Sequence, residues 1–105
     1  MIERIWHGWT TPENADAYEQ LLEEEIIPEF ADSGIDGYHG MRVLRRAHQD
    51  EVEFITVMRF SSLEAVKHFA GEDYKQAHVP EAARAVLARF DEQASHYELR
   101  MQKES

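Results

Sequence analysis

The segment over residues 52–60 constrains the fold of this chain more than any other part of the sequence. It is the most apolar stretch, and its β-branched and aromatic residues are typical of a strand. Alternate side chains of a strand point to opposite faces, and both faces are apolar here. One side carries Phe54, Met58 and Phe60, and the other carries Ile55 and Val57. Because a strand with one face in water alternates apolar and polar residues, the sequence predicts a central strand covered on both faces.

Hydrophobic periodicity predicts the elements that come before this strand. Residues 2–9 are typical of a strand, and a helix follows Pro12. Apolar residues recur at helical spacing there: Tyr18, Leu21, Leu22, Ile26 and Ile27. Pro28 lacks a backbone donor, so we expect the helix to bend or end there, before Ser33 and Gly34 close it. A second strand is expected over residues 38–48, with a turn at Gln49 and Asp50.

The second half of the chain begins with a helix signal. Ser61-Ser62-Leu63-Glu64 has the pattern of a capping box, in which a hydroxyl and a carboxylate satisfy backbone donors at a helix start. We expect this helix to reach Phe69 and to break at residues 70–73. Pro80 suits the first turn of a third helix. That helix carries Val86, Leu87 and Phe90, and a strand over residues 94–101 completes the chain.

The order of elements is βαββαβ in one domain over residues 1–105, because 105 residues cannot bury two independent cores. The two strand-to-helix junctions, residues 9–13 and 60–64, share a pattern of an aromatic residue, two hydroxyl residues, any residue and Glu. Right-handed crossovers then predict a ferredoxin-like α+β fold. We expect a four-stranded antiparallel sheet with the helices on one face and the first and third strands in the middle.

The sheet face without helices predicts the oligomeric state. Ile5 and Trp9 lie on the opposite side of the first strand from Trp6, so this strand is also apolar on both sides. A monomer would expose the uncovered face to water, and the simplest cover is a second copy packed sheet to sheet about a twofold axis. We therefore expect a homodimer.

Charge and residue types exclude several classes of function. The formal net charge of -10 repels nucleic acid and anionic membrane surfaces. The chain has no cysteine, which excludes disulfides, thiolate catalysis and cysteine-ligated metals. No histidine motif of a metal site and no glycine-rich phosphate loop is present. Charges interrupt the N-terminal segment and no apolar run matches a membrane span, so we expect a cytoplasmic protein.

Four segments resemble the antibiotic biosynthesis monooxygenase superfamily of dimeric α/β barrels. They are residues 40–46, 53–66 and 69–73, and the pair Phe90-Asp91 with His96-Tyr97-Glu98-Leu99. The resemblance spans nearly the whole chain and is nearest to members without an assigned substrate. It implies oxygen chemistry without a metal or flavin, in which a phenol or quinol loses a proton in a pocket between sheet and helices and its anion reduces dioxygen.

Three functions remain open at this point. The leading one is a homodimeric, cofactor-independent monooxygenase acting on a small aromatic or quinol-like substrate. A related branch binds and degrades haem, and residues 74–78 resemble the segment where those relatives place their iron-ligating histidine, which makes haem with His78 as ligand the alternative. Those relatives also use a tryptophan near the place of Phe69 and an asparagine in the first strand, which this chain lacks. The third is a dimeric small-molecule-binding protein without catalysis.

The oxygenase hypothesis requires a base, aromatic walls and groups that stabilise negative charge on oxygen. The candidate catalytic residues are His78, His68 and Tyr74, with a histidine as the base because imidazole accepts protons near neutral pH. Six aromatic residues are candidates for the walls of the substrate pocket: Trp6, Trp9, Phe54, Phe69, Tyr74 and Tyr97.

Charged and polar residues on the strands add further expectations. Arg59 shares a strand face with Ile55 and Val57, where an unpaired charge is costly, so we expect it to meet a carboxylate or an anionic substrate. The antiparallel first and last strands predict that His7 approaches His96 as a structural pair. We also expect Arg46 to face Glu53 across the hairpin.

Overall fold

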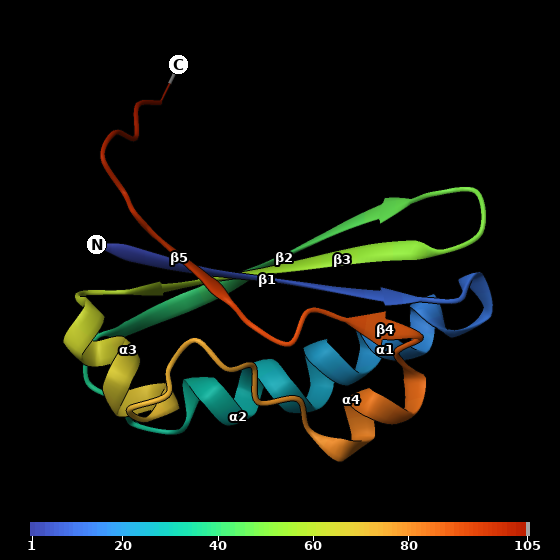
Figure 1. Cartoon of the computed structure of the whole chain (residues 1–105), viewed down its shortest axis with the longest axis horizontal. Coiled ribbons are helices and arrows are strands. Elements are labelled where there is room, and N and C mark those ends of the chain that lie inside the picture. The colour runs from blue at the N-terminus through green and yellow to red at the C-terminus, as the bar shows by residue number, and fades with distance from the viewer. Residues whose placement is uncertain (105) are drawn as a thin grey trace.

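The computed structural model describes residues 1–104 and consists of a twisted antiparallel sheet with the helices on one face (Figure 1). The strands are β1 (Ile2–Thr10), β2 (Tyr38–Ala47), β3 (Val52–Phe60), β4 (Arg89–Phe90) and β5 (Ser95–Glu98). They are ordered β2-β3-β1-β4, and β5 also pairs with β1. The predicted α+β ferredoxin-like fold is confirmed, with β1 and β3 in the middle, but the sheet has five strands rather than four because β4 and β5 both pair with β1.

The first helical region is continuous but irregular. It comprises the 3-10 turn η1 (Pro12–Asn14), α1 (Ala15–Leu21), the π-helical turn η2 (Leu22–Ile26) and α2 (Ile27–Ala31). The helix does not end at Pro28 but continues to Ala31. Its irregular turn lies before the proline, at Leu22–Ile26. In this π-helical turn, the N–H of Ile27 donates to the carbonyl of Leu22, five residues earlier.

The remaining helices are α3 (Leu63–Ala70) and α4 (Glu81–Val86). The capping box forms only in part. Ser62 is the N-cap, and its hydroxyl accepts a 3.1 Å hydrogen bond from the backbone N–H of Ala65. Glu64 then lies one position too early for the reciprocal bond. Ser61 instead lies 2.5 Å, Oγ to Nε2, from His39 on β2.

The predicted third helix is shorter than expected. Leu87 has extended backbone angles, and Phe90 pairs with Gly8 of β1 in the short strand β4. Backbone hydrogen bonds of 2.8 Å from Ala88 to the carbonyl of Trp9 and of 3.0 Å from Asp91 to that of His7 hold this segment on the sheet edge. Residues 87–90, which helical periodicity assigned to the third helix, therefore leave the helix, and Arg89 and Phe90 pair with the free edge of β1.

The last strand is also shorter than predicted, because its partner ends. Ile2 at the start of β1 pairs with Glu98, and the N–H of Leu99 makes a final 2.9 Å bond to the carbonyl of Met1. After Leu99, the chain extends away from the domain on the side of the sheet opposite the helices (Figure 1). Met101 in this segment is 82% exposed.

The two faces of the sheet differ in what covers them. Phe54, Met58 and Phe60 of β3 are buried beneath the helices, and the Tyr18 ring packs edge-on against Phe54 with 4.9 Å between centroids. The register places Ile5 and Val57 opposite each other on the other face, with Leu44 beside Ile55. Both faces of β3 are apolar, as predicted.

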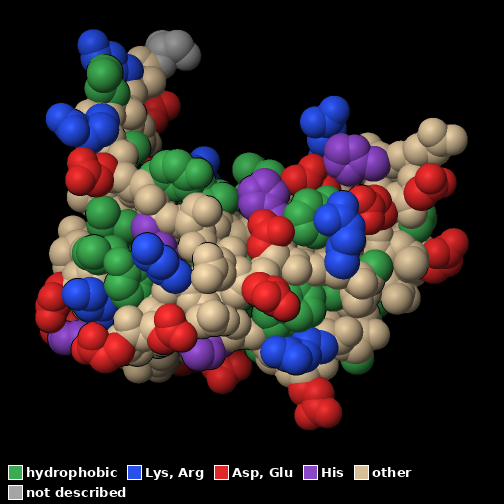
Figure 2. All heavy atoms as spheres, viewed as in Figure 1, with side chains coloured by type: hydrophobic (Ala, Val, Ile, Leu, Met, Phe, Trp, Pro, Cys, Tyr) green, Lys and Arg blue, Asp and Glu red, His purple; other side chains and the backbone are tan. Residues whose placement is uncertain are grey.

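Charged side chains are dispersed over the surface. On the face that Figure 2 shows, acidic and basic groups alternate without a continuous basic area. Among the described residues, no helix combines the length and apolar character needed to cross a membrane.

Candidate functional site

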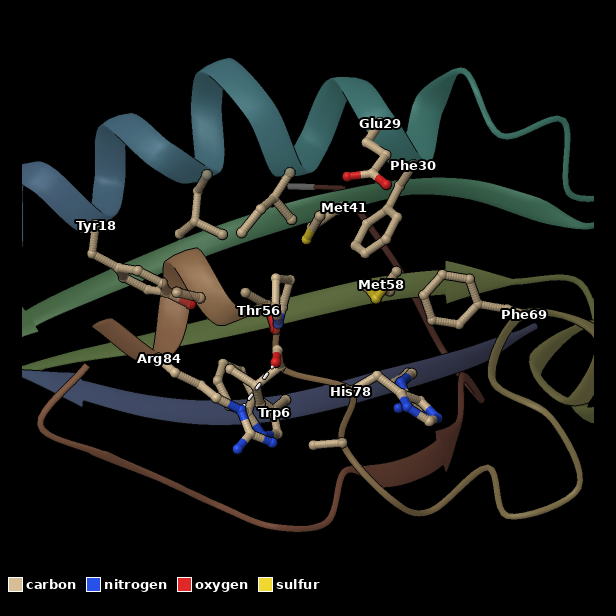
Figure 3. A pocket seen from close by; sticks show the side chains of 17 residues that line it. Trp6, Tyr18, Glu29, Phe30, Met41, Thr56, Met58, Phe69, His78 and Arg84 are labelled. Atoms are coloured by element: carbon tan, nitrogen blue, oxygen red, sulfur yellow. Dashed lines mark hydrogen bonds between the residues drawn. The ribbon is translucent and has the colours of Figure 1, made fainter. Parts of the chain in front are cut away.

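A cavity of about 480 Å³ lies between the helical layer and the sheet. Figure 3 shows Tyr18, Glu29 and Phe30 reaching down from the helices toward Met41, Thr56 and Met58 on the strands. Trp6, Phe69, His78 and Arg84 enclose the rest. This size and this mixture of aromatic walls with a few polar groups are typical of small-molecule sites.

Trp6 is fixed in the wall from three sides. Its Nε1 donates a 2.6 Å hydrogen bond to the carbonyl of Asp91, and its ring lies 5.9 Å from that of Phe90. The ring also lies close to Gly8, where any Cβ would come within 3.1 Å of it. The glycine therefore permits the indole to lie along the sheet and present an edge to the cavity.

His78 is the polar group best placed for proton transfer. It lines the cavity from the segment between α3 and α4, and its Nε2 lies 3.2 Å from the carbonyl of Ala70. A carbonyl only accepts hydrogen bonds, so Nε2 carries the proton in the neutral ring. The lone pair of Nδ1 is then free to accept a proton or to bind a metal ion.

Arg4 is the most deeply buried charge in the cavity, with 5% of its surface exposed. It lies on the helix-facing side of β1 and connects to the segment that precedes His78. Its Nη1 donates to the carbonyl of Tyr74 (2.5 Å), and its Nη2 donates to the carbonyl of Gln76 (3.2 Å). A third bond of 2.9 Å runs from Nη1 to Nε2 of His96.

His96 is a neutral acceptor in this cluster. Burial, followed by the positive charges of Arg4 and Lys75, lowers the pKa of His96 from 6.5 to about 4. Its ring also packs edge-on against Tyr74, with 5.2 Å between centroids. The imidazole therefore holds Arg4 in place without a charge of its own.

Tyr18 contributes a neutral phenol to the wall. It is 1% exposed, and burial raises the pKa of Tyr18 to about 12. The hydroxyl stays protonated at physiological pH, so it can donate a hydrogen bond but cannot act as a base.

Three of the residues predicted from the sequence meet in the cavity, namely Trp6, Phe69 and His78. The others lie elsewhere. His68 is exposed on α3 outside the cavity, and Phe54 belongs to the closed core beside it. Tyr74 borders a second, more open hollow that also contacts His96 and Tyr97.

Trp9 and Arg59 lie on the uncovered face of the sheet, opposite the cavity. The guanidinium of Arg89 covers the Trp9 ring at 3.8 Å from its centroid. Arg59 donates from Nη2 to the carbonyl of His39 at 3.1 Å, and its Nε is buried without a partner in the described structure. The expected carboxylate partner of Arg59 is not found there.

The predicted pairing of His7 with His96 is wrong. His7 points to the uncovered face and lies 2.9 Å, Nδ1 to Oε2, from Glu53, whose other oxygen contacts His48 at 2.9 Å. His96 pairs in register with Arg4 and faces the helices. Arg46 does face Glu53 in the register, as predicted, but the carboxylate is held by the histidines.

The sequence analysis did not identify Arg4, although Arg4 has the same sequence pattern as Arg59. Both are arginines on central strands, and the nearest residues on the same face of their own strand are apolar or aromatic. The choice between the faces depends on where the helices pack, which the alternation of one strand does not reveal. Within residues 1–104, no cluster of His, Asp and Glu is arranged to bind a metal ion.

No family model and no curated protein matches the sequence. Solved structures do match it over almost its full length. A protein from Bacillus cereus described as a candidate antibiotic biosynthesis monooxygenase has a TM-score of 0.62 and 18% identity, covering 99% of this chain and 94% of that chain. The haem degrader MhuD from Mycobacterium tuberculosis, with two haems bound in its active site, has a TM-score of 0.60 and 19% identity, covering 99% and 100%. These likenesses show a common fold.

The depressed pKa of His96 predicts a loss of stability in acid. Unfolded chains take up a proton on this residue near pH 6.5, whereas the folded protein resists it down to about pH 4. The free energy of unfolding should therefore fall as the pH is lowered through this window. Urea unfolding at several pH values should show a smaller fall in His96→Gln than in the wild type. The exposed-site control His68→Gln should retain the wild-type slope, and equal slopes in all three proteins would contradict the assignment.

Proposed function

We propose that this protein is a cofactor-independent monooxygenase that oxidises a small phenolic or quinol-like aromatic with dioxygen. The observation that carries the proposal is the free Nδ1 of His78 beside an aromatic-lined cavity. The resemblance to antibiotic biosynthesis monooxygenases and the shared fold with the Bacillus cereus protein support the same chemistry.

The first step is ionisation of the substrate. A planar ring enters between Trp6 and Phe69, and Nδ1 of His78 accepts the proton of its hydroxyl group. Apolar side chains from the helices and the sheet surround the ring, while His78 and Arg84 lie at the exposed rim of the cavity. Positive charge from Arg4 balances the developing oxyanion.

The second step transfers electrons from the phenolate to dioxygen. One oxygen atom bonds to a ring carbon and the other leaves as water, while the phenol becomes a quinone. All four electrons that reduce dioxygen come from the substrate, so no external reductant is required. The role of the protein is to form the anion and to hold it against the apolar wall of the cavity.

Removal of the base tests this proposal. We expect His78→Ala to lower kcat for oxygen uptake with a panel of naphthols and hydroquinones by about 10²- to 10⁴-fold. Labelled dioxygen should place one atom in the quinone product of the wild type. His68→Ala, exposed on α3, should keep the wild-type rate. Wild-type rates no higher than uncatalysed autoxidation would reject the proposal, and stabilisation by the same compounds would then favour a binding protein without catalysis.

Haem binding is the second candidate function, favoured by the fold shared with MhuD and by the single imidazole in the cavity. One neutral histidine nitrogen is the donor set of haem proteins with a proximal histidine, so His78 fits the group as its ligand. The iron would then supply redox chemistry, while Arg84 at the cavity wall provides a cation for a haem carboxylate.

Absorbance after addition of haem tests this candidate. Binding through His78 should shift the Soret band, and the shift should disappear in His78→Ala but persist in His68→Ala. An unchanged spectrum of the wild type would remove haem from consideration.

We further propose that a second copy of the chain covers the open face of the sheet. This face carries Ile5, Ile55 and Val57, and it exposes 47% of Leu44 and 57% of Tyr97. Residues 99–104 extend on the same side, toward the place of a partner (Figure 2). Covering such an apolar surface is the common reason for a twofold sheet-to-sheet dimer.

Light scattering at low micromolar concentration should give twice the chain mass of 12.3 kDa. Leu44→Arg replaces the exposed apolar side chain of the edge strand β2, next to Ile55, with a charge and should convert the protein to monomers. The control Gln20→Arg, on the exposed side of α1, should remain dimeric. A monomeric wild type would contradict the dimer.

A further inference from the structure

The charge of Arg4 has no counter-charge within the described residues. It is 5% exposed and forms no ion pair with an Asp or Glu of residues 1–104. Its three acceptors are the carbonyls of Tyr74 and Gln76 and the Nε2 of His96. All three are neutral, since burial keeps the pKa of His96 far below physiological pH. A buried cation held only by neutral dipoles is costly, and an anion beside it would recover that cost.

The guanidinium also retains hydrogen-bonding capacity toward the cavity. An arginine side chain has five N–H donors, of which the described contacts engage three. The group lies beside the aromatic wall, with its Cζ 5.8 Å from the centre of the Phe69 ring. A ligand stacked along that wall would bring an oxygen pair within reach of the remaining donors, in the forked geometry that arginine and carboxylates share.

The other charges around the cavity do not neutralise Arg4. Arg84 is a second cation, held by a 3.1 Å bond from its Nε to the carbonyl of Val79 and lying 5.6 Å from the Phe90 ring centre. Glu29 is exposed on α2 and makes no ion pair with a described residue. A protein with a net charge of -10 thus lines this cavity with two arginines and one carboxylate.

We propose that Arg4 determines substrate charge, selecting a planar aromatic that carries an anionic oxygen group, a carboxylate or a phenolate. This inference rests on the proposed function in taking the same cavity as the substrate site. It adds a specificity residue and a substrate class to that proposal. Arg4 binds the anionic group, and the ring lies against Trp6 and Phe69.

The competing explanation is that Arg4 serves only to anchor the segment before His78, through its bonds to Tyr74 and Gln76. Loss of that anchor would weaken every ligand equally. Loss of an anion-binding group would weaken only the charged ligand. A pair of probes with the same shape and different charge separates the two roles.

The experiment compares 2-naphthoate with 2-naphthamide by isothermal titration calorimetry on the purified protein at neutral pH. We expect the wild type to bind the carboxylate about tenfold or more tightly than the amide, as for a charge-assisted hydrogen bond. Arg4→Met should bring the two affinities together by weakening naphthoate alone. Arg42→Met, on the open face where Arg42 contacts Glu3, should keep the wild-type preference.

Arg4→Lys covers the case in which Arg4→Met does not fold. It keeps the charge and loses the fork, so the preference for naphthoate should shrink but persist while the affinity for naphthamide is unchanged. Equal wild-type affinities, equal weakening of both probes in the Arg4 variants, or no wild-type binding of either probe would overturn the inference. Because calorimetry needs no turnover, a protein that prefers naphthoate without consuming oxygen would retain this inference and lose only the monooxygenase.

Discussion

The pairing of β1 with β3 is the interaction on which the rest of the structure depends. All of β1, from Ile2 to Thr10, lies in antiparallel register with β3. This register decides that Arg4, Trp6, Thr56 and Met58 share the face beneath the helices, while Ile5, His7 and Val57 share the other. If β1 slipped by one residue relative to β3, its two sets of side chains would exchange faces. Arg4 and Trp6 would then lie on the open face instead of in the cavity. The edge strands β2, β4 and β5 then pair with β3 or β1, whose helix-facing and open faces are already fixed by this register.

The cavity arises because three parts of the chain meet over this central pair. The π-helical turn and α2 form one side, α3 contributes Phe69 to the second, and the segment with His78 closes the third. Arg4 connects the sheet to that last segment, and His96 from β5 holds the guanidinium in place. One buried arginine therefore has two consequences: it orders the segment that carries His78, and it makes the interior positive in an acidic protein. Both properties support the proposal that the cavity binds an aromatic anion.

The opposite face of the sheet has a different composition. Its apolar centre is bordered by charge pairs such as Arg42 with Glu3, and by the contacts of His7 and His48 with Glu53. An apolar patch within a polar border is the usual composition of an interface. The two proposals therefore concern opposite faces of the sheet: the proposed substrate site lies on the side of the helices, and the proposed dimer interface lies on the open side. That separation explains why Trp9 and Arg59, on the open face, lie outside the cavity that contains Trp6 and Arg4.

Local patterns in the sequence determined the elements, because hydrophobic periodicity and turn residues act over a few neighbours. They predicted β1, β2, β3, the start of the α3 helix and the ferredoxin-like order, and they selected Trp6, Phe69 and His78, which line the cavity. They misplaced Phe90, since the open edge of β1 outweighed helical spacing, and they favoured Arg59 over Arg4. Alternation along a strand tells which residues share a face but not which face meets the helices. Only the tertiary structure decided that, because helix packing and strand register join residues as distant as Arg4 and His96.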